Sequence, residues 1–169
     1  MTLSMYQASV PVFVRTLTNL KAILEKAAAH AQARKIEESV LLNARLYPDM
    51  FPLTRQVQIA SDFARGTSAR LSGVEPPPFE DNEKTFAELA DRIDRTLAYV
   101  RTLKSSDIEG SEARSITRPV RGVPHTFAGI DFLLKYAMPN FYFHTTTAYA
   151  ILRHSGVELG KGDFIGKID

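Results

Sequence analysis

The sequence predicts an all-α fold in which four long helices form a bundle. Apolar residues recur at steps of three and four along long stretches of the chain, which places them on one face of each helix. Proline or glycine marks most of the boundaries between these stretches. With 169 residues and 44% hydrophobic content, the chain has the size of a single domain, residues 1–169, around one core.

The first helix is expected to begin near Ser9, because Pro11 is tolerated only in a first turn, and to end near Arg34. Its apolar stripe consists of Val10, Phe13, Val14, Leu17, Leu20 and Leu24. A short helical piece is expected over residues 37–43. The segment 47–50 has prolines nearby and cannot be regular helix throughout.

The second long helix is expected to begin at Pro52 and to end at Gly73, before a stiff proline-rich connector at 75–78. Thr85 and Glu88 have the spacing of a capping box, in which each side chain satisfies a free backbone amide of a helix start. A third helix is therefore expected from Thr85 to Lys104, where the amphipathic pattern is clearest.

The helical repeat is lost over residues 105–124, which predicts a small hairpin or an ordered loop. Thr126 is expected to cap the fourth helix, and Pro139 is expected to kink it. The remaining tail, 157–169, is expected to dock on the bundle through Phe164 and Ile165.

Composition excludes several classes of function. The 21 basic and 19 acidic residues are interleaved, whereas a nucleic-acid-binding protein needs a basic face. Without cysteine the chain has no disulfide, no thiolate nucleophile and no zinc site of cysteine type. No signal peptide and no apolar run of membrane-spanning length is found. We therefore expect a cytoplasmic protein that binds neither nucleic acid nor membrane.

His144 is the strongest candidate for a functional residue among four histidines. Tyr136, Asn140, His144 and Thr147 follow steps of four, four and three, and so form a polar stripe on an otherwise apolar helix. One interpretation is a ligand-binding or catalytic histidine. The other is a buried histidine that is hydrogen-bonded to an asparagine or tyrosine. The second helix and its entry segment offer Gln56 and Asp49 as polar partners.

The remaining histidines favour plainer interpretations. His30 and His154 lie near helix ends, where solvated histidines are common. His125 precedes the expected start of the fourth helix and is either a neighbour of the cap or a lid residue.

Two further groups of residues point to partners. Arg114, Arg118 and Arg121 could bind an anion at the mouth of a pocket, although a solvated charged loop explains them equally well. The aromatic residues of 141–143 and Tyr149 cannot all face one core, because consecutive helical positions point about 100° apart. The sequence therefore favours a homodimer.

Three segments, Leu3–Pro11, Leu42–Gln58 and Pro139–Gly156, together resemble a bacterial family of uncharacterised proteins, the domain of unknown function nineteen-ninety-three. The likeness covers nearly the whole chain. That family resembles a branch of the DinB and YfiT-like superfamily, which implies a four-helix bundle that is commonly dimeric. Better-known members of the superfamily bind a divalent metal through three histidines, and some are thiol-dependent transferases or isomerases.

The resemblance also implies where a metal would bind. The last helix of the superfamily carries two histidines four residues apart, and here Asn140 and His144 stand in that register. No histidine lies between Arg34 and Pro124, where the third ligand would be expected. Since an amide is a poorer ligand than imidazole for zinc or nickel, no metal or other cofactor is expected. If a divalent metal binds, its ligands would be His144, Asn140 and Asp49.

Three hypotheses about function follow. The first is a metal-free protein that binds a small ligand in a polar pocket between helices, formed by Asp49, Gln56, Tyr136, Asn140 and His144. The second is a metal- or thiol-dependent transferase or isomerase with His144 as general base or metal ligand. The third is a structural or stress-associated homodimer. The sequence leaves open whether the chain is an enzyme.

Overall fold

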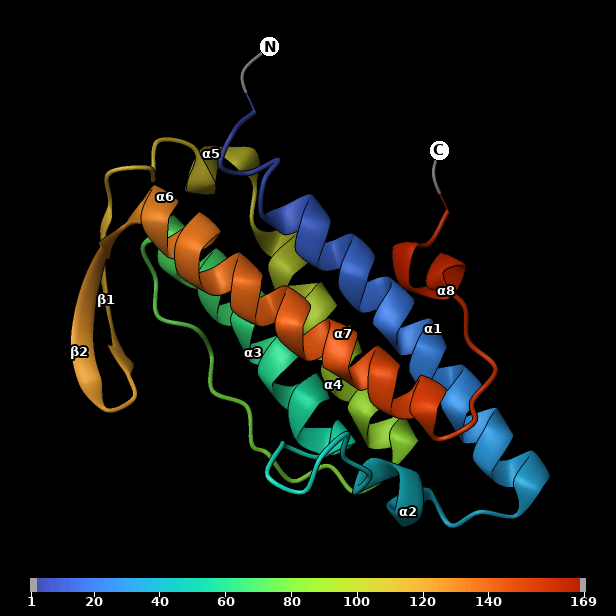
Figure 1. Ribbon diagram of the computed structural model, residues 1–169. Coiled ribbons are helices and arrows are strands. Elements are labelled where there is room, and N and C mark those ends of the chain that lie inside the picture. Colours follow the sequence, from blue (N-terminus) through green and yellow to red (C-terminus); the bar gives the residue numbers. More distant parts are fainter. Residues whose placement is uncertain (1–2, 168–169) are drawn as a thin grey trace.

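Four long helices lie side by side in the computed structural model, which describes residues 3–167 (Figure 1). They are α1 (Val10–Arg34), α3 (Leu53–Ser72), α4 (Phe86–Thr102) and α7 (Met138–His154). Helix α4 packs against both α1 and α3, and α3 packs against α7. The predicted long helices therefore form a bundle, in the order of contact α1, α4, α3, α7.

The apolar stripes predicted from the sequence meet in the core of this bundle. Phe13 of α1 and Phe141 of α7 are both fully buried and pack edge to face, with ring centroids 4.9 Å apart. Buried side chains also come from α3 and α4, including Leu53, Val57, Leu89, Ile93 and Val100. Burial of apolar surface on this scale is the main force that holds the helices together.

Two helix boundaries lie where the sequence predicts them, and each is set by a local interaction. Thr85 accepts a hydrogen bond from the Glu88 backbone amide at 3.1 Å, and the Glu88 carboxylate accepts one from the Thr85 amide at 3.1 Å. This arrangement confirms the capping box. Gly73 follows α3 with φ +82°, a left-handed conformation that glycine adopts without strain.

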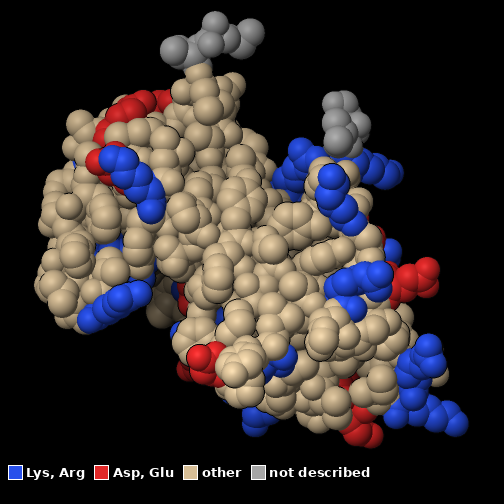
Figure 2. Space-filling view, in the orientation of Figure 1, with Lys and Arg blue, Asp and Glu red and all other residues tan. Residues whose placement is uncertain are grey.

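Shorter helices cover the ends of the bundle. Helix α2 (Glu38–Leu42) lies beside the start of α3, where Thr54 Oγ1 donates to the Leu42 carbonyl at 3.0 Å. Helix α5 (Ser105–Ile108) follows α4 at the opposite end (Figure 1). The face of the molecule in Figure 2 carries acidic and basic side chains that are scattered over several elements.

A β-hairpin lies between α5 and the last long helix. Strands β1 (Ser115–Val120) and β2 (Val123–Ala128) pair antiparallel and project from one end of the bundle (Figure 1). The two turn residues, Arg121 and Gly122, have φ values of +52° and +80°, as in the turns that fit the twist of a hairpin. The hairpin expected as one of two alternatives is present, so the chain is mostly helical and all-α is too narrow a class.

The expected helix cap at Thr126 is wrong. Thr126 lies in β2 opposite Thr117, and the two hydroxyl oxygens are 2.7 Å apart. Cross-strand pairing therefore uses a hydroxyl that could otherwise have capped a helix. The helix begins three residues later, with α6 (Gly129–Asp131).

The last helix is irregular one turn before Pro139. Between α6 and α7 lies a π-helical segment, η1 (Phe132–Ala137), after which the Met138 amide donates to the Leu133 carbonyl five residues back. Pro139 has no amide hydrogen and would crowd a carbonyl in a regular α-helical turn. The helix continues through Pro139 (Figure 1), with this widened turn just before the proline, and the kink expected at Pro139 stays a prediction.

The tail folds back onto α1 and includes α8 (Lys161–Ile165). Phe164 packs against Tyr149, with ring centroids 5.9 Å apart, and its carbonyl accepts a hydrogen bond from Asn19 at 3.1 Å. The tail thus docks on the bundle through Phe164, as expected. Residues 168 and 169 of the tail lie outside the described part of the chain. Within residues 3–167 no helix has the length and apolar character needed to span a membrane.

Candidate functional site

His144 lies on α7, faces α3 and is only 8% exposed. Its Nδ1 is 2.7 Å from Oε1 of Gln56. Gln56 in turn donates from Nε2 to the backbone carbonyl of Phe51 at 3.0 Å. Because the amide nitrogen of Gln56 is used there, its Oε1 acts as acceptor and His144 Nδ1 carries the proton. The Nε2 atom of His144 is therefore left with a lone pair.

Burial keeps this imidazole neutral. The removal of His144 from water, with the nearby charge of Arg55 as a smaller cause, lowers its pKa from 6.5 to about 4. At neutral pH the ring therefore serves as a hydrogen-bond donor at Nδ1 and an acceptor at Nε2.

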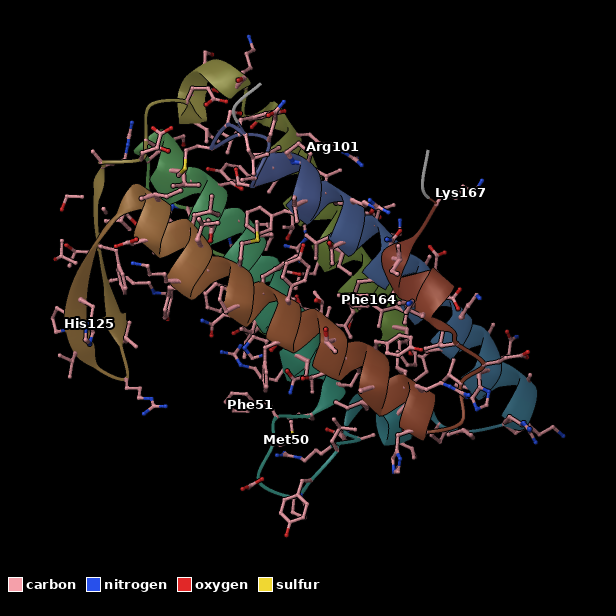
Figure 3. The ribbon with its side chains drawn as sticks, turned by 45° about the horizontal axis from the view of Figure 1, so that its top comes forward. Met50, Phe51, Arg101, His125, Phe164 and Lys167 are labelled. Atoms are coloured by element: carbon pink, nitrogen blue, oxygen red, sulfur yellow. The ribbon has the colours of Figure 1, made fainter. Side chains whose placement is uncertain are left out.

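His144 lines a cavity of about 230 Å³ between α7 and the segment that enters α3. The other lining residues are Asp49, Met50, Phe51, Gln56 and Phe143. Figure 3 shows Met50 and Phe51 on the loop that leads into α3. Arg45 donates to the Met50 carbonyl at 2.6 Å, which holds this loop in place. Phe51 and Phe143 are 54% and 55% exposed, so the mouth of the cavity is aromatic.

Tyr136 and Asn140 line a second cavity, of about 380 Å³. The ring of Phe63 lies between the two sites, with its centroid 6.2 Å from that of His144 and 5.7 Å from that of Tyr136. Asn140 donates to the Tyr136 carbonyl at 2.7 Å. The structure thus brings Asp49, Gln56 and His144 together and places Tyr136 and Asn140 on the far side of Phe63.

These residues do not fit a three-histidine metal site. Among the described residues, no second histidine lines the cavity of His144, and Asn140 offers an amide oxygen where the resemblance implies an imidazole. Asn140 and His144 also line different cavities. Over residues 3–167 there is no group of three or more histidine, aspartate or glutamate side chains that could hold a metal ion.

The other histidines lie elsewhere. His125 is on the exposed hairpin (Figure 3), and His154 is exposed at the end of α7. His30 lines a larger cavity, of about 780 Å³, between α1 and the tail, which Lys26 and Asp163 bridge with an ion pair of 2.6 Å. None of the residues proposed for the His144 site reaches that cavity.

A buried charge network was missed in the sequence. Arg92 of α4 has no exposed surface and forms ion pairs with Asp62 at 2.8 Å, Asp81 at 2.9 Å and Glu83 at 2.9 Å. The signal was available, because Arg92 follows Leu89 by three residues and so lies on the apolar stripe of its helix.

Comparison with known proteins identifies the family. The family described as "Domain of unknown function (DUF1993)" matches residues 5–165. None of the curated proteins matches the chain. Among solved structures, the chain is similar to a DinB family member protein from Shewanella denitrificans, with 44% identity and a TM-score of 0.91 over 96% of this chain and 92% of that one. The chain therefore belongs to the DUF1993 family and shares its fold with a DinB family member.

Proposed function

We propose that this protein binds a small ligand in the cavity between α7 and the entry to α3, and that His144 Nε2 accepts a hydrogen bond from it. One observation carries the proposal, the chain of hydrogen bonds from His144 through Gln56 to the Phe51 carbonyl. This chain of hydrogen bonds fixes the proton on Nδ1 and leaves Nε2 as an acceptor on a histidine that lines the cavity.

The walls of the cavity indicate what kind of ligand fits. Phe51 and Phe143 offer aromatic surface at its mouth, and Asp49 adds an exposed carboxylate at the rim. Pockets that combine apolar walls with a few placed polar groups are typical of small-molecule sites. The expected ligand has an apolar body and a hydrogen-bond donor that meets His144.

Binding is favoured over the transferase or isomerase alternative. A general base works best when its pKa is near the working pH, and a pKa of about 4 makes His144 a weak base. The metal-dependent form of that alternative also lacks support, because Asn140 and His144 line separate cavities.

Phenol and anisole form a matched pair of probes, since both carry an aromatic ring but only phenol has a donor. Titration followed by NMR should give saturable chemical-shift changes at His144 and Gln56 with phenol. Anisole should bind at least about fivefold more weakly, because it cannot form the hydrogen bond to His144. His144→Phe should remove the difference between the probes, and His125→Gln should preserve it. Equal affinities for both probes in the wild-type protein would contradict the proposal.

A homodimer is the second candidate, and exposed aromatic residues favour it. Of the aromatic group on α7, Phe141 is buried and Tyr149 packs on Phe164, but Tyr142 and Phe143 remain 42% and 55% exposed. Large exposed aromatic side chains that lie close together often mark an interface. We propose that α7 meets a second copy of the chain through these two residues.

Light scattering during size-exclusion chromatography tests the dimer. The wild-type protein should elute with the mass of two chains, and Phe143→Ser should reduce it to one. Val123→Ser, on the exposed hairpin, is the control and should leave the mass unchanged. A wild-type monomer at about 100 µM, well above the Kd of a stable dimer, would exclude this candidate.

A further inference from the structure

The second cavity, which we call the arginine cavity, is lined by four arginines and one acidic residue. Its volume is about 380 Å³, and the charged residues are Arg55, Arg65, Arg70, Arg118 and Asp62. It lies between α3, the proline-rich connector, β1 and the last helix. Figure 2 shows the surface hollowed between the hairpin and the helical body. Such an excess of positive charge raises the question of what neutralises it.

Part of this charge is neutralised within the protein. Arg65 donates to Asp62 at 2.8 Å, and Arg55 forms an ion pair with Asp81. Asp62 also pairs with the buried Arg92 at 2.8 Å, through the same oxygen, Oδ1. Neither Arg70 nor Arg118 forms an ion pair with any acidic side chain of residues 3–167.

Arg118 is held in the cavity by aromatic rings instead. Its guanidinium carbon lies 5.4 Å from the ring centroid of Phe63 and 5.1 Å from that of Tyr136. Cation–π contacts of this kind hold the guanidinium near the rings and leave its N–H groups free to donate. Its Nε is buried and has no hydrogen-bond partner among the described residues. Arg118 is therefore oriented but not neutralised.

Arg70 lies close enough to Arg118 for the two positive charges to interact. Its Nη1 donates to the Gly66 carbonyl at 3.1 Å, a neutral partner. A Cβ atom at position 66 would come within 2.6 Å of that Nη1, so the glycine leaves room for the guanidinium. Burial and the charge of Arg118 lower the pKa of Arg70, and the charge of Glu75 offsets them only in part, so the positive charge of Arg70 is not fully compensated.

We propose that Arg70 and Arg118 together bind the carboxylate or phosphate group of a small organic anion, whose apolar part rests on Phe63 and Tyr136. A planar guanidinium matches the geometry of both oxyanions and can donate two hydrogen bonds to either. A carboxylate would neutralise one of the two neighbouring positive charges in this partly buried site, and a phosphate monoester would neutralise nearly both. Aromatic walls make an anion with a ring or apolar body a better ligand than a bare ion. This site is separate from the His144 cavity and does not rest on the function proposed there.

Calorimetry with four probes tests the chemistry of the ligand. Benzoate and phenyl phosphate each combine an oxyanion with a ring, inorganic phosphate lacks the ring, and benzyl alcohol lacks the charge. We expect saturable binding of benzoate, of phenyl phosphate or of both, and whichever binds tighter identifies the oxyanion. Inorganic phosphate should bind more weakly, and benzyl alcohol should not bind. Absence of saturable binding of both ring anions at about 10 mM in low salt would overturn the proposal.

Variants locate the binding within the molecule. Arg118→Gln and Arg70→Gln should each weaken binding of the better anion about tenfold or more, and Arg118→Lys should weaken it less, because the charge remains but the planar fork is lost. Arg101→Gln is the matched control, since Arg101 is an exposed arginine on α4 (Figure 3). Thermal unfolding of each variant verifies that it folds. Equal effects of Arg101→Gln and Arg118→Gln would contradict the proposal, as would a loss of anion binding in His144→Phe.

Discussion

Arg92 is a fully buried positive charge surrounded by the carboxylates of Asp62, Asp81 and Glu83. Burial raises the pKa of Glu83, but hydrogen bonds from Arg92 and Gln58 outweigh it, and the pKa falls below its usual range. Arg92 and Glu83 therefore both stay ionised inside the protein. A buried pair of this kind is costly to break, because the remaining partner is left as an uncompensated charge.

Replacement of Arg92 should destabilise the protein strongly. Arg92→Met nearly keeps the volume of the side chain but leaves Glu83 with only the Gln58 hydrogen bond and the longer contact to Arg95 at 3.8 Å, so the free energy of unfolding should fall by about 3–5 kcal/mol. Urea denaturation followed by circular dichroism measures the change. Arg101→Met should change stability by less than about 0.5 kcal/mol. Adding Glu83→Gln to Arg92→Met should recover part of the loss, and strictly additive losses would argue against direct coupling.

His144 should make stability depend on pH below neutrality. Its pKa is about 4 in the folded protein and near 6.5 when unfolded, so between these values the unfolded chain binds more protons. Stability should therefore fall as the pH drops from about 6.5 to 4, by about 3 kcal/mol for this group. Unfolding in urea across this pH range should show a shallower dependence for His144→Phe than for His125→Gln. Identical slopes in the two variants would mean that His144 is protonated without cost.

At the scale of elements, prediction from sequence succeeded where the signals are local. The bounds of α1, α3 and α4 followed from apolar steps, a capping box and a terminal glycine, all of which act within a few residues. The start of the last helix was wrong because Thr126 suits both a helix cap and a strand. Its pairing with Thr117 is a contact across the hairpin that periodicity does not reveal.

The candidate site was predictable in part for the same reason. His144 and Gln56 were recognised as polar positions on apolar helices, and the structure joins them. Counting in fours also put Tyr136 on the stripe of His144, but the ring of Phe63, from another helix, separates the two. Arg118 was considered only with its loop neighbours, since the sequence does not show that Arg70 lies close to it.

The junction between hairpin and last helix depends on Gly129. A Cβ atom there would lie 2.0 Å from the backbone carbonyl oxygen of Ser111, which cannot move aside as a flexible side chain could. Gly129→Ala should therefore lower the free energy of unfolding by about 1–3 kcal/mol and increase hydrogen exchange in β2. Gly162→Ala is the control, because a Cβ atom at Gly162 meets nothing within 4 Å. Unchanged stability in Gly129→Ala would show that the hairpin can shift freely.

At the scale of the whole molecule, the tail connects the first and last helices. Phe164 packs on Tyr149 of α7, and its carbonyl is bonded to Asn19 of α1. Asp163 adds an ion pair with Lys26 at 2.6 Å. We propose on this basis that the chain unfolds as a single domain with the tail as an integral part of it.

Loss of the Phe164 ring should therefore weaken the entire fold. Phe164→Ala is expected to cost about 1–2 kcal/mol, less than a fully buried phenylalanine, because Phe164 is only half-buried. Calorimetry should still show one transition at a lower Tm, whereas Lys161→Ala should leave the Tm nearly unchanged. A separate early transition in the wild-type protein would contradict the single-domain proposal.

The π-helical segment Phe132–Ala137 accommodates one extra residue in the last helix. A π turn holds about one residue more than an α turn, so deletion of one residue within it would allow a regular α-helix. The residues on the two sides of that deletion would keep their rotation relative to one another. Deletion of one residue from the regular part of α7 would instead rotate every residue before it by about 100°, and Arg118 would leave the ring of Phe63. The hairpin can therefore keep its direction when the chain is shortened in this segment, but not when it is shortened in the helix that follows.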